Sequence, residues 1–176
     1  MNWKQWVLPL AFVLCAQSMA RGAGNEPVWS LSSAVSYSSG DYGSGDDTDM
    51  LYIPVTVRLY FSRGYVAGTV PYFEVNDAAS DATEAGLGDV LLKGGLYVLD
   101  EDAHRPGVDL VAKVKLPTAD EQAGLGTGAL DGGGGVECYK WLGYPWIGFL
   151  DAYVMFIGGS AATDESLQQI GDLGLG

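Results

Sequence analysis

Few residues of this chain are of a type that could do covalent or metal chemistry. The one histidine, His104, stands between Asp102 and Arg105 in a charged turn, whereas the base of a Ser-His-Asp triad must be presented to a nucleophile at a buried site. The two cysteines, Cys15 and Cys138, are too few to build a zinc cluster with a single histidine. We therefore predict no enzyme activity, no cofactor and no metal site.

Two segments resemble ion-binding loops only superficially. The acidic run of Asp41, Asp46, Asp47 and Asp49 lacks the EF-hand spacing with its central glycine, which indicates a solvated loop. The segment from Gly124 to Gly135 is rich in glycine, but no Lys follows as a phosphate-binding loop would require. We expect a flexible external loop there.

A larger set of charged residues is spaced so that it could act together. These residues alternate with apolar ones, so that the charges of each segment would share one face of a strand. They could form a ladder of charges that sets ionic selectivity along a passage, or they could pair with one another and plug a narrow interior. The set consists of Arg58, Asp89, Lys93, Asp109, Lys113, Lys115, Glu137 and Asp151. Tyr52, Tyr60 and Tyr97 could face the same way and contact an aromatic solute.

The secondary structure that positions these residues is predicted to be β-strands, because apolar residues recur at every second position. Between residues 51 and 61 every odd-numbered position is apolar, and between them stand mixed residues that include Arg58. The pattern recurs at 29–37, 90–98, 108–116 and 150–156, and more weakly at 65–75 and 136–142. Most of these seven strands are longer than the five or six residues usual in soluble sheets, a length that suits a tilted strand crossing a bilayer.

Two further patterns favour an antiparallel transmembrane β-barrel. Short connections such as 62–64 and 143–145 alternate with the long polar ones at 38–48, 76–85 and 118–135. Aromatic residues gather at strand ends, as Trp141, Tyr144 and Trp146 do around one short turn. The alternative is a secreted β-sandwich, which would place the charged residues on its solvent face.

The N-terminus has the pattern of an export signal. Lys4 precedes a short apolar segment, Val7 to Ala16, and small residues mark a cut after Ala20, with a cut after Ala23 as the alternative. The alternative interpretation of this apolar segment is a helix in the hydrophobic core of the folded protein. The expected organisation is a signal peptide over 1–20 and a β-barrel domain over 21–176. A net charge of -13 argues against nucleic acid as a partner.

Several stretches of the chain resemble the outer-membrane transporter family named for the meta pathway of phenol degradation. They are YSSGDYG at 37–43, DMLYIPVTVR at 49–58, TVPY at 69–72, GLGDVLLKG at 86–94 and KVKLPTAD at 113–120, extended by GLGTG at 124–128 with Asp131. The resemblance covers roughly residues 29 to 160. It implies a β-barrel channel or transporter for small molecules in the outer membrane of a Gram-negative bacterium, and it names no solute; the tyrosines named above would suit an aromatic or hydrophobic one.

The chain differs from that family at its end. Family members continue for several more strands, and Leu173-Gly174-Leu175-Gly176 offers no terminal aromatic residue. We expect either an eighth strand near 166–176 or a C-terminally truncated barrel. The implied partners are outer-membrane lipid, lipopolysaccharide, the barrel assembly machinery and a small solute. The alternative function is a small closed structural or adhesive barrel without a pore; a secreted binding sandwich is the third.

Overall fold

The computed structural model describes residues 18–21, 27–41, 47–77, 82–144, 146–158 and 166–175. This part of the chain consists of strands, turns and bends, with no helix. The strands are β1 (Ser18–Arg21), β2 (Pro27–Ser33), β3 (Ser36–Asp41), β4 (Asp47–Phe61), β5 (Gly64–Asp77), β6 (Ala82–Leu87), β7 (Val90–Leu99), β8 (Gly107–Leu116), β9 (Asp131–Gly143), β10 (Trp146–Ile157) and β11 (Ser166–Leu175). The prediction of an all-β fold is confirmed.

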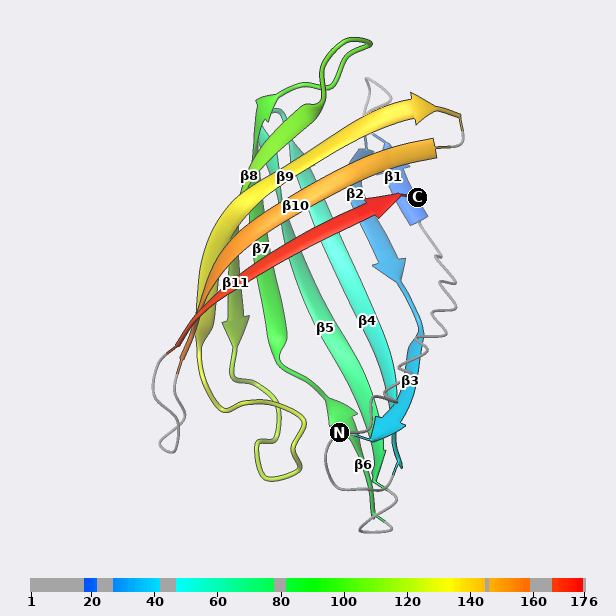
Figure 1. Ribbon diagram of the computed structural model, residues 1–176, viewed down its shortest axis with the longest axis vertical. Coiled ribbons are helices and arrows are strands. Elements are labelled where there is room, and N and C mark those ends of the chain that lie inside the picture. Colours follow the sequence, from blue (N-terminus) through cyan, green and yellow to red (C-terminus); the bar gives the residue numbers. More distant parts are fainter. Residues whose placement is uncertain are drawn as a thin grey trace, which may run out of the picture. The chain divides into compact units, whose positions relative to one another are not determined.

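Neighbours in the sequence are mostly neighbours in the sheet (Figure 1). The path of hydrogen-bonded strands runs β1-β2-β4-β5-β7-β8-β9-β10-β11, while β3 also pairs with β4 and β6 with β5. Each ladder whose register is known, such as β8 with β9 and β9 with β10, is antiparallel. Successive strands joined by turns give this meander, as alternating patterns separated by glycine-rich turns predict.

The first predicted strand is interrupted where the sequence pattern showed no break. We expected one strand over 29–37, but β2 ends at Ser33 and β3 begins at Ser36. Extending the β3–β4 register places Ala34 opposite Pro54, and the Ala34 amide donates to the Pro54 carbonyl at 3.4 Å. Proline has no amide hydrogen with which to donate the second hydrogen bond of the pair, so the strand ladder is interrupted here.

The predicted long connections are shorter than expected because strand pairing extends into them. β3 continues to Asp41 and faces the start of β4 at Asp47, so the acidic run borders a hairpin. β5 continues to Asp77, which pairs with Ala82 of β6. The expectation of a flexible loop over 124–135 is wrong in its second half, since Gly132 to Gly135 lie within β9 and pair with both β8 and β10.

Both ends of the chain contribute strands. Of the two alternatives for 166–176, the structure has a further strand there, β11, which pairs with β10 from Gly148 to Ile157. β1 spans the predicted cleavage site after Ala20 and pairs with β2. Residues 1–17, the rest of the predicted signal peptide, lie outside the described residues.

The chain forms two compact units. Unit 1 comprises Met1–Val57, Thr69–Val90 and Pro117–Gly128, and unit 2 comprises Arg58–Gly68, Leu91–Leu116 and Ala129–Gly176. In unit 1, the rings of Tyr52 and Phe73 are 4.9 Å apart, and Thr56 and Thr69 share a hydrogen bond of 2.8 Å. In unit 2, the most buried apolar residues include Tyr65, Val111 and Tyr153.

In β4, β7, β8 and β10 the exposed large side chains are apolar, and the charged side chains described there are covered. In β4 the exposed residues all belong to the apolar stripe, with Leu59 44% accessible, whereas Arg58 beside it is half-buried. In β8, Leu110 is 49% accessible and its neighbour Asp109 only 6%. The same applies to other large apolar residues of the strands, namely Val57, Leu92, Leu96, Val98, Val114, Leu150, Val154 and Phe156. In a protein surrounded by water, the charged faces would be exposed and the apolar faces covered.

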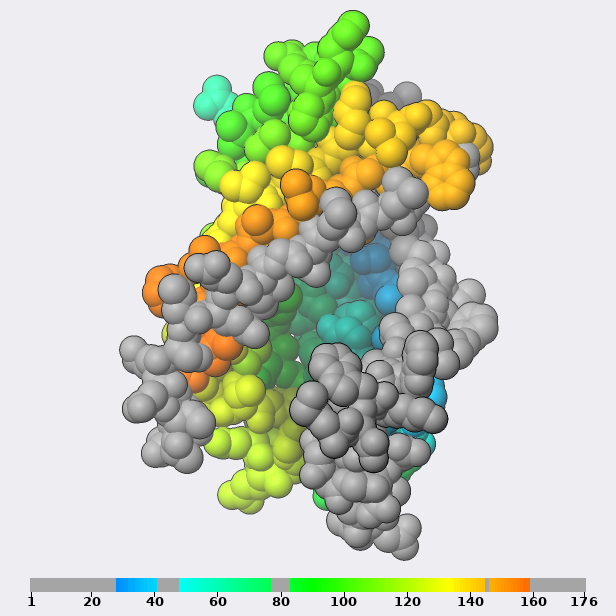
Figure 2. Space-filling view, in the orientation of Figure 1, coloured from blue at the N-terminus to red at the C-terminus, as the bar shows by residue number. Residues whose placement is uncertain are grey.

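The exposed apolar surface includes aromatic rings at the β9–β10 hairpin. Figure 2 shows the yellow and orange atoms of these two strands at the surface. Trp141 and Trp146 are both 55% accessible, and Tyr144 at the turn is almost fully exposed. No helix in the described ranges is long and apolar enough to cross a membrane.

Candidate functional site

The covered face of unit 2 carries a row of carboxylates at paired positions. Asp109 of β8 lies opposite Glu137 of β9, which lies opposite Asp151 of β10. Paired residues of an antiparallel sheet point to the same side, and their Cβ atoms are about 5 Å apart. Like charges so placed repel one another, so the row requires donors from elsewhere.

Glu137 receives those donors from three other strands. Its carboxylate forms an ion pair with Lys93 of β7 and accepts hydrogen bonds from Tyr153 of β10 and, at 3.1 Å, from Tyr65 of β5. The side chains of Lys93 and Glu137 are both largely covered, at 18% and 17% accessibility. Water screens a covered ion pair less than one on the surface, so the attraction between the two charges is stronger, provided that their hydrogen bonds are satisfied.

The tyrosines of this face lie against glycines on adjoining strands. A Cβ atom added to Gly95 would stand 2.3 Å from the Tyr65 ring, and one on Gly135 would stand 2.5 Å from Tyr153. The same holds for Gly107 of β8, where the added atom would be 2.4 Å from the ring of Tyr139, its cross-strand partner. Glycine at these positions lets the rings lie flat on the backbone.

The cations of the face bind aromatic rings and carboxylates. The Arg58 guanidinium lies 4.5 Å from the centre of the Tyr65 ring and 5.9 Å from that of Tyr60. The Lys113 ammonium lies 3.4 Å from the centre of the Tyr153 ring. Such cation–π contacts contribute about 0.5–2 kcal/mol each, depending on how dry the site is. Lys115 forms an ion pair with Asp131 at the start of β9.

Asp109 differs from Glu137 in its surroundings. It is 6% accessible, and among the described residues its Oδ1 atom is the buried side-chain oxygen that has no hydrogen-bond partner. A buried acceptor left without a donor costs about 1–3 kcal/mol. The Asp109 carboxylate is therefore the unsatisfied position of the row.

Seven of the eight predicted charged residues come together in unit 2, and the eighth does not. Asp89 belongs to unit 1, as does Tyr52, while Tyr60 and Tyr97 belong to unit 2. Tyr97 packs on Tyr65, with ring centres 6.1 Å apart. Sequence reasoning did not select Tyr65, Tyr139, Tyr153 and Asp131. The sequence feature that could have identified them is their alternation with the apolar residues of the same strand. This alternation is clear around Tyr153 and weak around Tyr65.

Asp89 holds a loop rather than facing a passage. It is 8% accessible, and its Oδ1 atom accepts hydrogen bonds of 3.0 Å from the amides of Thr118 and Ala119. Its Oδ2 atom accepts one of 3.3 Å from the Thr127 amide, and the Thr118 hydroxyl accepts one from the Val90 amide at 2.9 Å. The carboxylate thereby joins GLGDV with both ends of the segment 117–128.

The backbone of the segment 117–128 requires glycine at two positions. Gly124 and Gly128 have φ of 69° and 65°, values that favour glycine. Asp120 accepts hydrogen bonds from the amides of Gln122 and Ala123, which closes a turn just before Gly124. Leu125 is buried against Gly86. The first half of the predicted flexible loop is thus an ordered turn structure.

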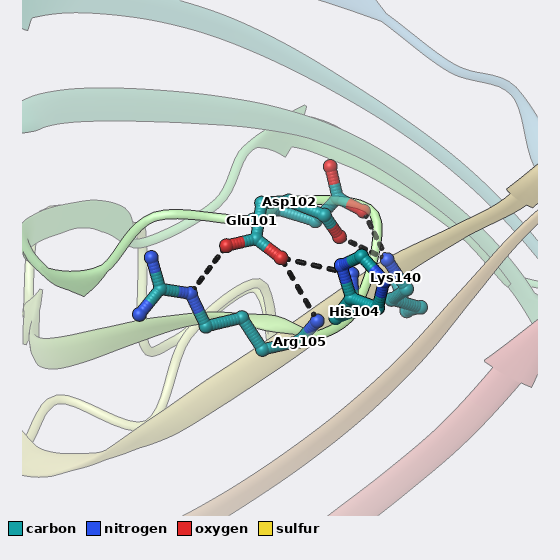
Figure 3. A network of polar contacts seen from close by, with 5 residues as sticks. All are labelled: Glu101, Asp102, His104, Arg105 and Lys140. Atoms are coloured by element: carbon teal, nitrogen blue, oxygen red, sulfur yellow. Dashed lines mark hydrogen bonds and ion pairs between the residues drawn. The ribbon is translucent and has the colours of Figure 1, made fainter.

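A second polar network of unit 2 orders the connection between β7 and β8 (Figure 3). Lys140 of β9 forms an ion pair with Glu101 at 2.5 Å and donates to the carbonyl of Asp102. The Asp102 carboxylate accepts hydrogen bonds from the His104 amide at 2.8 Å and from Arg105, and these bonds lower the pKa of Asp102 below its usual value. His104 contributes its backbone here, in the charged turn that we predicted.

The side chains of the covered face can bind charged and aromatic groups through ion pairs, hydrogen bonds and cation–π contacts. Within the described ranges no three histidine, cysteine or acidic side chains are grouped as metal ligands would be. Cys138 lies in β9, as predicted, with a free thiol that is half-buried. Comparisons with models of protein families, with curated proteins and with solved structures found no match.

Proposed function

We propose that this chain is an outer-membrane β-barrel protein, or part of one, that lets small molecules pass without covalent chemistry. The observation that carries the proposal is the inverted exposure of the strands, with apolar side chains exposed and charged ones covered. Lipid would cover the exposed stripe, and each apolar side chain there would otherwise be held in water at a cost of about 25 cal/mol per Å².

The covered face supports passage rather than catalysis. Mixed charges and tyrosine rings line one side of unit 2, which is the composition expected of a water-filled lumen. The aromatic residues of the β9–β10 hairpin would sit at the membrane interface, where an apolar ring with a polar edge is favoured. The resemblance to outer-membrane transporters agrees with the proposal, and export by a signal peptide is part of it.

A second candidate rests on the ion pairs. Lys93 with Glu137 and Lys115 with Asp131 neutralise charges across the covered face, as they would in a closed barrel whose interior is packed. Such a protein would serve adhesion or membrane integrity and would conduct nothing.

The test is to fold the full chain into detergent and then into lipid. A folded barrel should migrate differently on a gel before and after boiling, and it should appear in the outer-membrane fraction. Ion conductance in a planar bilayer then separates passage from the packed barrel. A chain that stays soluble without detergent would contradict membrane insertion and favour the secreted sandwich.

A further inference from the structure

The covered face of unit 2 contains two examples of how this protein holds an ammonium group. The Lys93 ammonium pairs with the Glu137 carboxylate and lies 5.5 Å from the centre of the Tyr65 ring. The Lys113 ammonium lies 3.4 Å from the centre of the Tyr153 ring. In the first example a carboxylate and a tyrosine ring hold the ammonium ion together, and in the second a tyrosine ring lies against it.

Asp109 interacts electrostatically with Lys93 and Arg58, but unlike Glu137 it has a carboxylate oxygen that meets no donor among the described residues. It lies directly opposite Glu137, and its Oδ1 atom is buried with no donor among the described residues. Tyr139 occupies the next position along that face of β9, and its ring lies against Gly107 of the strand that carries Asp109. Tyr97 and Tyr139 are both within electrostatic reach of the Asp109 charge.

The chemistry of the position selects the class of ligand. A buried carboxylate oxygen without a donor needs a hydrogen-bond donor, and a negative charge beside a second carboxylate needs a positive one. An anion would be repelled by the row of Asp109, Glu137 and Asp151. A metal ion would need more ligands than one carboxylate, and no metal-ligand group is formed by the described residues.

We propose that Asp109 is a binding site for the ammonium group of a small protonated amine, held between its carboxylate and the adjacent tyrosine rings. The inference rests on the proposed passage of small molecules and makes Asp109 the residue that determines preference for cationic solutes. Lys93 forms its ion pair with Glu137, so Asp109 is the carboxylate of the two that has an oxygen without a donor.

The test uses the full chain in planar bilayers with two probes of equal charge. Methylammonium can donate hydrogen bonds, whereas tetramethylammonium cannot. We expect methylammonium to block the potassium current at concentrations at least about tenfold lower than tetramethylammonium does, the effect of one charge-assisted hydrogen bond. In Asp109→Asn this difference should disappear, and in the control Glu84→Gln, which removes an exposed charge of unit 1, it should persist.

The outcomes are distinguishable. A conducting wild-type chain that responds equally to both probes, or a folded Asp109→Asn variant that retains the difference, overturns the ammonium site and leaves passage standing. A folded chain that conducts nothing overturns passage and the ammonium site together. Should Asp109→Asn fail to fold, the contrast between the two probes on the unmodified chain still decides.

Discussion

Asp89 in unit 1 and Asp109 in unit 2 are equally buried aspartates with opposite surroundings. Asp89 accepts hydrogen bonds from three backbone amides of one segment, whereas Asp109 has a buried oxygen without a donor. Backbone donors cannot be withdrawn without unfolding the segment, so Asp89 stabilises structure. An oxygen without a donor costs stability, and a cost retained in a folded chain is typical of a position that a ligand completes.

The largest effect is expected from Asp89→Asn. The substitution replaces one carboxylate oxygen by an NH2 group, so in either orientation at least one backbone amide meets a donor. The free energy of unfolding should fall by about 2–3 kcal/mol. Urea titration of the folded chain in detergent, followed by tryptophan fluorescence, measures it. An unchanged midpoint would mean that the loop 117–128 does not depend on this carboxylate.

Gly135→Ala should have the next largest effect, and it tests the close packing of β10 on Gly135 in unit 2. The added Cβ would stand 2.1 Å from the Ala152 carbonyl oxygen and 2.5 Å from the Tyr153 ring. We expect destabilisation of about 2 kcal/mol, as for overpacking elsewhere. The matched control is Gly40→Ala in β3, where the added atom meets nothing within 4 Å. Equal effects of the two changes in the same urea titration would contradict the close Tyr–Gly packing.

Asp109→Asn makes the comparison with Asp89→Asn directly, because both variants make the same chemical change. It removes a charge opposite Glu137 and relieves an oxygen without a donor. We expect the free energy of unfolding to change by less than about 1 kcal/mol, in the stabilising direction. A loss as large as that of Asp89→Asn, measured in the same urea titration, would show that Asp109 is a structural anchor as well.

The smallest effect concerns Asp102, in the connection between β7 and β8. The hydrogen bond from the His104 amide lowers the pKa of this carboxyl in the folded chain. Its contribution to stability is therefore present above the unfolded pKa of about 3.9 and is lost as the pH falls through the lower, folded value. The amide chemical shifts of His104 and Arg105 should titrate below about pH 3.9. They should not titrate there in Asp102→Asn.

Local patterns predicted where strands run but not always where they end. Alternation located the strands that became β4, β7, β8 and β10, because the period of two is a property of the extended chain itself. It missed the break opposite Pro54 and the strand character of Gly132 to Gly135. Both depend on the partner strand: one on a missing amide hydrogen across the ladder, the other on Tyr153 and Met155 of β10, which leave no room for side chains at Gly135 and Gly133.

The sequence by itself determined an acidic, all-β chain whose strands each have an apolar and a charged face, because side-chain alternation is local. Only the tertiary structure decided which face is exposed, since that depends on how strands assemble. It also separated Asp89 from the other charged residues. Asp89 and Asp109 both adjoin alternating apolar residues in the sequence, yet they have opposite roles. The reason is that hydrogen-bond donors come from residues distant in sequence, which no local pattern contains.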